Sequence, residues 1–237
     1  MQKYKNSDKK HSLICFQAPI KYKIQRKRND GMPLCYKIFK EKDHADGFMK
    51  GNIYFSAAGR FMNERDNQRQ YSEGTVPIYT HPCYIENIQV PNPYYQSYDE
   101  TLRVPLFCCS SINQNNAVYD EGKLTILIPP ENKILGRHLV YFDTDELFRL
   151  IGEGAKKGNW GIRGEKITYY NFDKLRDDSW LDKIHNFVDP LFIHDARHDN
   201  QNEFRFVLTH KLLPKGAESI TLQCGEWHTK PIYVELN

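Results

Sequence analysis

The sequence predicts an α+β fold class, a β-rich single domain whose strands pair mostly antiparallel. Short apolar or alternating runs recur along the 237 residues, separated by Pro, Asn and Gly. Few helical segments lie between these runs, too few for a wound parallel sheet. A hydrophobic fraction of 40% in a chain of this length is enough to bury a core without disulfides or metals.

The first part of the chain is basic. We expect residues 1–33 to form a basic N-terminal arm and residues 34–237 a single domain. Lysines and arginines crowd the arm, which can touch a phosphate backbone. The alternative is a solvated tail or an edge strand protected by lysines. The start lacks the features of a signal peptide, and no apolar run could span a membrane, so we expect a cytoplasmic protein with no membrane partner.

A strand, helix, strand unit opens the domain. Residues 34–40 alternate as a strand does, residues 41–51 predict a short helix that Gly51 can end, and residues 52–56 predict a second strand. The polar, arginine-containing stretch 60–74 lacks apolar periodicity, which indicates a loop.

The middle of the chain is rich in predicted strands. Asp143, with Glu146 three residues later, resembles a capping box that opens a helix ending near Gly152. The glycines from 152 to 164 miss the GxGxxG spacing, so we expect a mobile loop there and no nucleotide-binding turn. The predicted strands of this region are 76–80, 84–90, 102–109, 123–128 and 138–142.

The last part continues in the same way. Residues 166–171 predict a strand, residues 177–188 an amphipathic helix, and residues 219–224 and 231–236 the closing strands.

The run QNEFRFVL, residues 201–208, is the most informative of the predicted strands. With a period of two, Gln201, Glu203 and Arg205 share one face. Phe204, Phe206 and Leu208 share the other face and can anchor it in a core. Such a strand mounts a carboxylate on a rigid element. The alternative is a half-exposed strand whose Glu and Arg form a solvated pair.

A Gln-x-Glu pair on one face suits glycosyl-transfer chemistry. Departure of a leaving group from a ribose carbon builds positive charge on the sugar, and a fixed carboxylate stabilises that state. The side chain two residues earlier faces the same cleft and can orient the incoming nucleophile.

Other chemistries have weaker support. His194 and His198 are four residues apart, but Asp195 stands where a zinc protease needs Glu, and we expect no metal site. Cys108 and Cys109 end a predicted strand, yet no spacing links either to a histidine, so buried thiols are the default.

Several segments together resemble a family of bacterial and phage-linked proteins of largely uncharacterised function. They are the unit at 34–56, the polar loop with Arg65-Asp66 that ends in Glu73-Gly74, the LFCCS run and the Q-x-E-F-R-F run. That family's closing strand reads carboxylate or amide, any residue, Glu, aromatic, Arg. Its plan is similar to the ADP-ribosyltransferase fold, in which a split sheet binds NAD.

The resemblance implies roles for individual residues. Glu203 would be the catalytic glutamate on the nicotinamide-side ribose, and Gln201 would orient the acceptor. Tyr36 and Lys37 stand where such enzymes hold NAD with His or Arg. Ser56 matches the first serine of a Ser-Thr-Ser motif, and Arg65, near Asp66 and Glu73 at the cleft mouth, could contact a pyrophosphate. We also assign Arg205 to the NAD-binding set.

The resulting hypothesis is an NAD-dependent mono-ADP-ribosyltransferase that uses NAD as co-substrate. The basic arm and the arginines from Arg60 to Arg69 favour nucleic acid, RNA or DNA, as the acceptor. A toxin or phage-defence effector held by a neutralising antitoxin protein is the setting that this activity implies. The alternatives are a non-enzymatic nucleic-acid-binding or sensor protein and a metal-dependent nuclease that uses His194 and His198.

Overall fold

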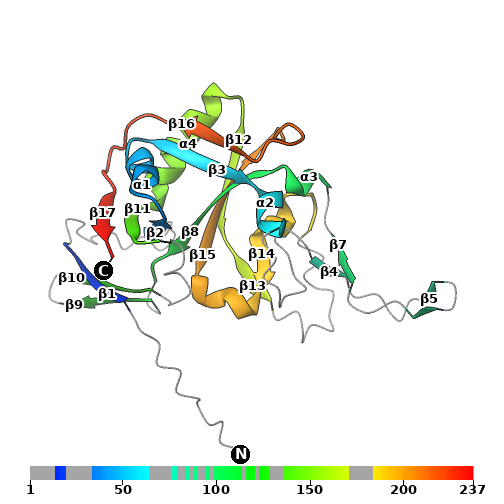
Figure 1. Ribbon diagram of the computed structural model, residues 1–237, viewed down its shortest axis with the longest axis horizontal. Coiled ribbons are helices and arrows are strands. Elements are labelled where there is room, and N and C mark those ends of the chain that lie inside the picture. The colour runs from blue at the N-terminus through cyan, green and yellow to red at the C-terminus, as the bar shows by residue number, and fades with distance from the viewer. Residues whose placement is uncertain are drawn as a thin grey trace, which may run out of the picture.

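The computed structural model describes most of the chain outside the arm. The described residues are 14–19, 34–63, 76–78, 84–85, 88–89, 94–96, 99–113, 116–120, 123–128, 136–170 and 184–236. Within them the fold is α+β and strand-rich, with mostly antiparallel sheets, as the sequence predicts (Figure 1).

An eight-stranded sheet forms the centre. Six of its strands run in the order β12-β15-β8-β2-β11-β17, and β3 and β16 complete it. Every pairing within this sheet is antiparallel. Its strands are β2 Leu34–Phe39, β3 Asn52–Ala57, β8 Pro105–Ser111, β11 His138–Asp143, β12 Gly161–Lys166, β15 Glu203–Thr209, β16 Ser219–Gln223 and β17 Ile232–Glu235.

Smaller sheets and short helices surround the centre. A three-stranded sheet has the order β1-β10-β9, and β13 and β14 form the one parallel pair among the described strands. These elements are β1 Ile14–Pro19, β4 Val76–Ile78, β5 Tyr84–Ile85, β6 Ile88–Gln89, β7 Tyr94–Gln96, β9 Ala117–Asp120, β10 Lys123–Ile128, β13 Thr168–Tyr170, β14 Ile193–Asp195, the α-helices α1 Lys42–Met49, α2 Ala58–Asn63, α3 Asp99–Leu102 and α4 Thr144–Lys157, and the 3₁₀ helices η3 Asp189–Phe192 and η4 Ala196–Gln201.

The central sheet forks along β8. Ser110 of β8 lies opposite Tyr36 of β2, whereas Leu106 of the same strand lies opposite Ser56 of β3. β15 pairs along the other side of β8. β2 and β3 therefore diverge on one side of β8, and α1 connects them across the gap.

One face of the sheet packs against both long helices. Phe204, Phe206 and Leu208 of β15 lie in one buried cluster with residues of α1 and α4. This confirms the apolar face that the sequence predicts for the strand. Phe48 of α1 stacks on Phe107 of β8 at 5.7 Å between ring centroids. The indole of Trp227 also donates to the Phe48 carbonyl oxygen at 3.1 Å. These contacts fix α1 at the fork.

The opposite face is covered in two separate places. Ile126 and Ile128 of β10 pack on Tyr36 and Ile38 of β2. Farther along, the segment 188–192 packs on a second patch that includes Val207 of β15. Figure 1 shows β1, β9 and β10 at one end of the sheet and β13 and β14 at the other.

The predicted glycine loop is wrong. Helix α4 continues through Gly152 to Lys157, and β12 begins at Gly161. A Cβ on Gly154 would lie 2.6 Å from the Cys224 sulfur, and one on Gly164 would lie 2.9 Å from the Phe206 ring. The glycines thus permit close packing of helix and strand. Asp143 caps α4, because its carboxylate accepts from the backbone N–H groups of Asp145 and Glu146.

Other boundaries also differ. The range 84–90 contains two short strands joined as a hairpin. β8 begins at Pro105 and not at residue 102, because Leu102 is the last residue of α3. Residues 184–188, the described end of a predicted helix, are not helical, and residues 177–183 lie outside the described part. Within the arm, β1 is an edge strand on β10, the alternative that the lysines also allowed.

Candidate functional site

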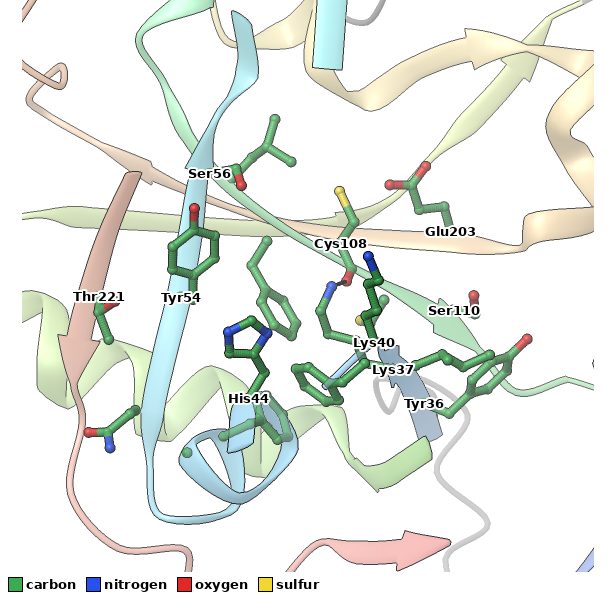
Figure 2. Close-up of a pocket in the computed structure, with 18 of the residues that line it drawn as sticks. Tyr36, Lys37, Lys40, His44, Tyr54, Ser56, Cys108, Ser110, Glu203 and Thr221 are labelled. Atoms are coloured by element: carbon green, nitrogen blue, oxygen red, sulfur yellow. Dashed lines mark hydrogen bonds between the residues drawn. The ribbon is translucent and has the colours of Figure 1, made fainter. Parts of the chain in front are cut away.

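A cavity of about 870 Å³ lies at the fork. Its walls come from β2, α1, β3, α2, β8, β15 and β16, so residues from both ends of the sequence meet there. Figure 2 shows Glu203 and Ser110 on one side and Tyr54 and Thr221 on the other. The volume is in the range of pockets that bind small molecules or cofactors, about 300–1,000 Å³.

A row of polar side chains crosses three neighbouring strands at one end of the cavity. Glu203 of β15 lies opposite Ser110 of β8, and Ser110 lies opposite Tyr36 of β2. Directly opposed residues of antiparallel strands point to the same face. All three side chains line the cavity.

Arg205 fixes the Glu203 carboxylate through two hydrogen bonds. Arg205 Nε donates to Oε1 at 2.7 Å and Nη2 donates to Oε2 at 2.8 Å. A third bond runs from Arg205 Nη1 to the Leu191 carbonyl oxygen at 2.7 Å. Glu203 is 9% exposed and Arg205 is 1% exposed. The pair is thus a buried, bidentate ion pair and not the solvated pair that a half-exposed strand would carry.

The turn before β15 fixes the start of this strand. Asn202 has a φ of 46°, and its side chain accepts from Asn113 Nδ2 at 2.9 Å. The Glu203 backbone N–H donates to the Tyr169 hydroxyl at 2.9 Å. Gln201 therefore ends η4 instead of continuing the strand, which corrects the predicted strand register. It still lines the same cavity as Glu203.

Lys37 occupies the fork itself. Its Nζ donates to the Cys108 carbonyl oxygen at 2.6 Å and lies 4.5 Å from the centre of the Phe107 ring. Cys108 lies between the β8 residues that pair with β2 and those that pair with β3. The lysine thus bonds a strand carbonyl at the point where the sheet divides.

The outer wall is the solvent-side face of β3. Asn52, Tyr54 and Ser56 line the cavity, while the alternate residues Ile53 and Phe55 are buried in the core. Tyr54 is 45% exposed, and its hydroxyl accepts from Arg60 Nη1 at 2.9 Å. This wall therefore presents one open aromatic ring beside hydroxyl and amide groups.

Cations outnumber carboxylates among the lining residues. Lys37, Lys40 and Arg60 line the cavity, against Asp43 and Glu203, and the imidazole of His44 also lines it. The Lys40 and His44 side chains make no hydrogen bond or ion pair with any residue in the described ranges. The cavity away from Glu203 is therefore suited to an anionic group.

The residues predicted from the sequence are only partly brought together. Tyr36, Lys37, Ser56, Gln201 and Glu203 all line the cavity. Arg205 is not among the lining residues and lies beneath Glu203.

Three residues predicted at the cleft mouth, Arg65, Asp66 and Glu73, lie outside the described residues. Sequence reasoning missed Lys40, His44 and Tyr54. The alternation Asn52-x-Tyr54-x-Ser56 was the signal that could have identified the β3 wall.

The geometry gives little support to the two alternative chemistries, a nucleophilic cysteine and a metal site at His194 and His198. Burial, followed by a hydrogen bond with Cys35, raises the pKa of the Cys109 thiol well above its usual value, which disfavours the nucleophilic thiolate. Cys108 is only partly buried and lines the cavity, so the expectation of a buried thiol is wrong for this residue. The His194 and His198 rings meet edge to face at 4.5 Å between centroids. No three His, Cys, Asp or Glu residues within the described ranges gather as metal ligands.

In the described part of the chain, every helix is too short or too polar to span a bilayer.

Comparisons with known proteins give no relatives: no protein-family model, no curated protein and no solved structure matches this chain.

Proposed function

We propose that the protein is an NAD-dependent mono-ADP-ribosyltransferase with a macromolecular acceptor. The observation that carries the proposal is the Glu203 carboxylate, pinned by Arg205 at one end of a cavity of about 870 Å³. The fork between β2 and β3 supports a split-sheet cleft of the ADP-ribosyltransferase kind. NAD would be the co-substrate.

Glu203 retains capacity for a ligand although Arg205 binds both of its oxygens. An ionised carboxylate has about four lone-pair sites, and the two guanidinium bonds use two of them. The remaining sites can accept from a ribose hydroxyl. Because Arg205 fixes the carboxylate before the ligand arrives, little reorganisation is needed when positive charge develops on the sugar.

The proposed reaction transfers ADP-ribose from nicotinamide to the acceptor. The glycosidic C–N bond breaks, and its electron pair leaves with nicotinamide. The acceptor nucleophile forms the new bond to the same ribose carbon and loses its proton to solvent. Glu203 stabilises the cationic sugar between these events, and Gln201, which lines the same cavity, is placed to orient the acceptor.

The lining residues fit such a co-substrate. Lys37, Lys40 and Arg60 offer positive charge to a pyrophosphate, and Tyr36, Ser56 and Ser110 offer hydroxyls to riboses. The basic residues of the arm support nucleic acid as acceptor. An enzyme that modifies nucleic acid endangers its own cell, so we further propose a toxin or phage-defence effector held by a neutralising protein.

A second candidate is a non-enzymatic nucleic-acid-binding or sensor protein. The same ion pair favours it, because a buried bidentate pair can be purely structural. In that case the cationic lining would contact phosphates directly, and Glu203 would serve only to neutralise Arg205.

A single substitution at Glu203 does not separate the two candidates. Glu203→Gln removes the charge that neutralises a buried Arg205, so the variant loses stability whatever its function. The double variant Glu203→Gln/Arg205→Met replaces the ion pair by uncharged side chains of similar volume. Its stability is expected to return towards that of the wild type.

The decisive assay combines the purified proteins with NAD and total nucleic acid and measures free nicotinamide. We expect release by the wild type and a loss of about 100- to 1,000-fold in both the single and the double variant. Nicotinamide release at the wild-type rate by the folded double variant would exclude catalysis by Glu203. No release by the wild type, with nucleic-acid binding that falls steeply with salt, would select the second candidate.

A further inference from the structure

The wall opposite Glu203 carries an aromatic side chain, Tyr54, to which the proposed transfer chemistry gives no role. Tyr54 is the large hydrophobic residue exposed on the described surface, and it faces the cavity. Its position is set by β3, where it lies opposite Thr221 of β16. Figure 2 shows Tyr54 and Thr221 together, across the cavity from Glu203.

The Tyr54 ring is fixed in position but remains exposed to solvent. Arg60 donates to its hydroxyl from the neighbouring α2, which restrains the far end of the ring. The residues on either side in β3, Ile53 and Phe55, are completely buried, so the strand beneath it is anchored in the core. A restrained ring with an open face is a stacking surface for another planar group.

Positive charge lies in the same part of the cavity. Lys40 follows β2 and His44 lies on α1, and both line the cavity between Glu203 and Tyr54 in Figure 2. Asp43 is the acidic lining residue on α1, whereas Lys40 and Arg60, which bonds the Tyr54 hydroxyl, supply two positive charges, so the local balance is cationic. A phosphate close to Tyr54 would find these cations within the same cavity.

From these observations, we propose that Tyr54, Lys40 and His44 form a nucleoside-phosphate subsite in which Tyr54 stacks the base, and the Lys40 ammonium and the His44 imidazole contact the phosphate. A nucleoside phosphate is the ligand class that combines a planar ring with an anionic group. The subsite deepens the proposed function and rests on it for orientation: the adenylate half of NAD lies on Tyr54 and the nicotinamide half reaches Glu203.

The test is a calorimetric titration, which requires no turnover. ADP, adenosine and inorganic pyrophosphate are titrated into the wild type and into the Tyr54→Ala, Tyr54→Phe and Lys40→Ala variants. Tyr54→Ala is expected to weaken ADP binding about 5- to 150-fold, the range of one base stacked on an aromatic ring. Tyr54→Phe, which keeps the ring and loses only the bond from Arg60, is expected to stay close to the wild type.

The partial ligands separate the two contacts. Lys40→Ala is expected to weaken ADP and pyrophosphate and to leave adenosine unchanged, whereas Tyr54→Ala weakens ADP and adenosine and spares pyrophosphate. Equal ADP affinity in the wild type and a folded Tyr54→Ala variant overturns the proposal. So does the absence of ADP binding by the folded wild type.

Two further arms keep this subsite distinct from the transferase proposal. Tyr54-dependent ADP binding without nicotinamide release supports the subsite and removes the transferase. Nicotinamide release with a KM for NAD that Tyr54→Ala leaves unchanged supports the transferase and excludes the subsite. A single-stranded oligonucleotide that binds more tightly than ADP, with the same dependence on Tyr54, would assign the ring to the acceptor strand and overturn the orientation.

Discussion

Two buried carboxylates in this protein pair with arginine in opposite ways. Glu203 receives both of its bonds from Arg205, which is 1% exposed and also donates to a carbonyl. Asp189 receives one bond from Arg163 Nη1 at 2.5 Å, and two backbone N–H groups, those of His185 and Asn186, donate to its other oxygen. Arg163 is one-third exposed and also bonds Glu165.

The difference separates a structural carboxylate from one that can serve a ligand. Asp189 closes the turn 185–189, and its bonds come mostly from the backbone. Glu203 closes no turn, and it faces a cavity. In the Asp189–Arg163 pair, the arginine has spare hydrogen-bond donors in water. In the Glu203–Arg205 pair, the carboxylate has spare acceptor sites next to a ligand-sized cavity.

The largest effect on stability is expected from Arg205→Met. This change leaves the Glu203 carboxylate buried without its counter-ion, and breaking a buried pair in this way costs about 3–5 kcal/mol. Chemical unfolding with urea measures the difference. Recovery of most of that loss in Glu203→Gln/Arg205→Met is the matched control. A loss below about 1 kcal/mol in Arg205→Met would show that the pair is not desolvated.

The next effect is expected from Asp189→Asn, which removes the charge but keeps one acceptor oxygen for the turn. Lost hydrogen bonds to a charged group are worth about 1.5–3 kcal/mol, and we expect a loss in that range. Nicotinamide release measured below the unfolding transition should remain at the wild-type level, because Asp189 does not line the cavity. Reduced release by the folded variant would contradict the distinction between the two carboxylates.

A smaller effect is expected from Arg163→Met, the counterpart of Arg205→Met. Arg163 is partly solvated, and Asp189 keeps its two backbone donors, so the loss should be about 1 kcal/mol. The same urea titration applies. If Arg163→Met and Arg205→Met cost the same, exposure of the arginine does not explain the difference between the pairs.

The sequence predicted the parts of this site that follow from local geometry. The alternation along residues 203–208 is enough to place Glu203 with Arg205 and to bury Phe204 and Phe206, because side chains of any strand alternate. It could not show that Gln201 leaves the strand, since that depends on the left-handed turn at Asn202.

Long-range packing explains the other misses. β8 changes its neighbour from β2 to β3 between Ser110 and Leu106, and no local pattern marks such a change. The loop predicted for the glycines failed for a similar reason. What Gly154 and Gly164 accommodate are Cys224 and Phe206, which are distant in sequence.

The smallest predicted effect is the change in stability with acid pH, which depends on the Asp189 carboxylate. Burial raises the pKa of Asp189, but hydrogen bonds from Arg163 and from the His185 and Asn186 N–H groups outweigh it and hold that pKa below its usual 3.8. Because the folded-state pKa is depressed, the carboxylate stabilises the protein fully above its unfolded-state pKa, and this stabilisation is lost as pH falls through the folded-state value.

The stability difference between the wild type and Asp189→Asn should therefore be constant from neutral pH down to about pH 5 and shrink below that, given an unfolded-state pKa near 3.9. Urea unfolding at several pH values measures this difference. A gap that keeps its size at the lowest pH where both proteins fold would mean that the turn, and not the charge on Asp189, supplies the stability.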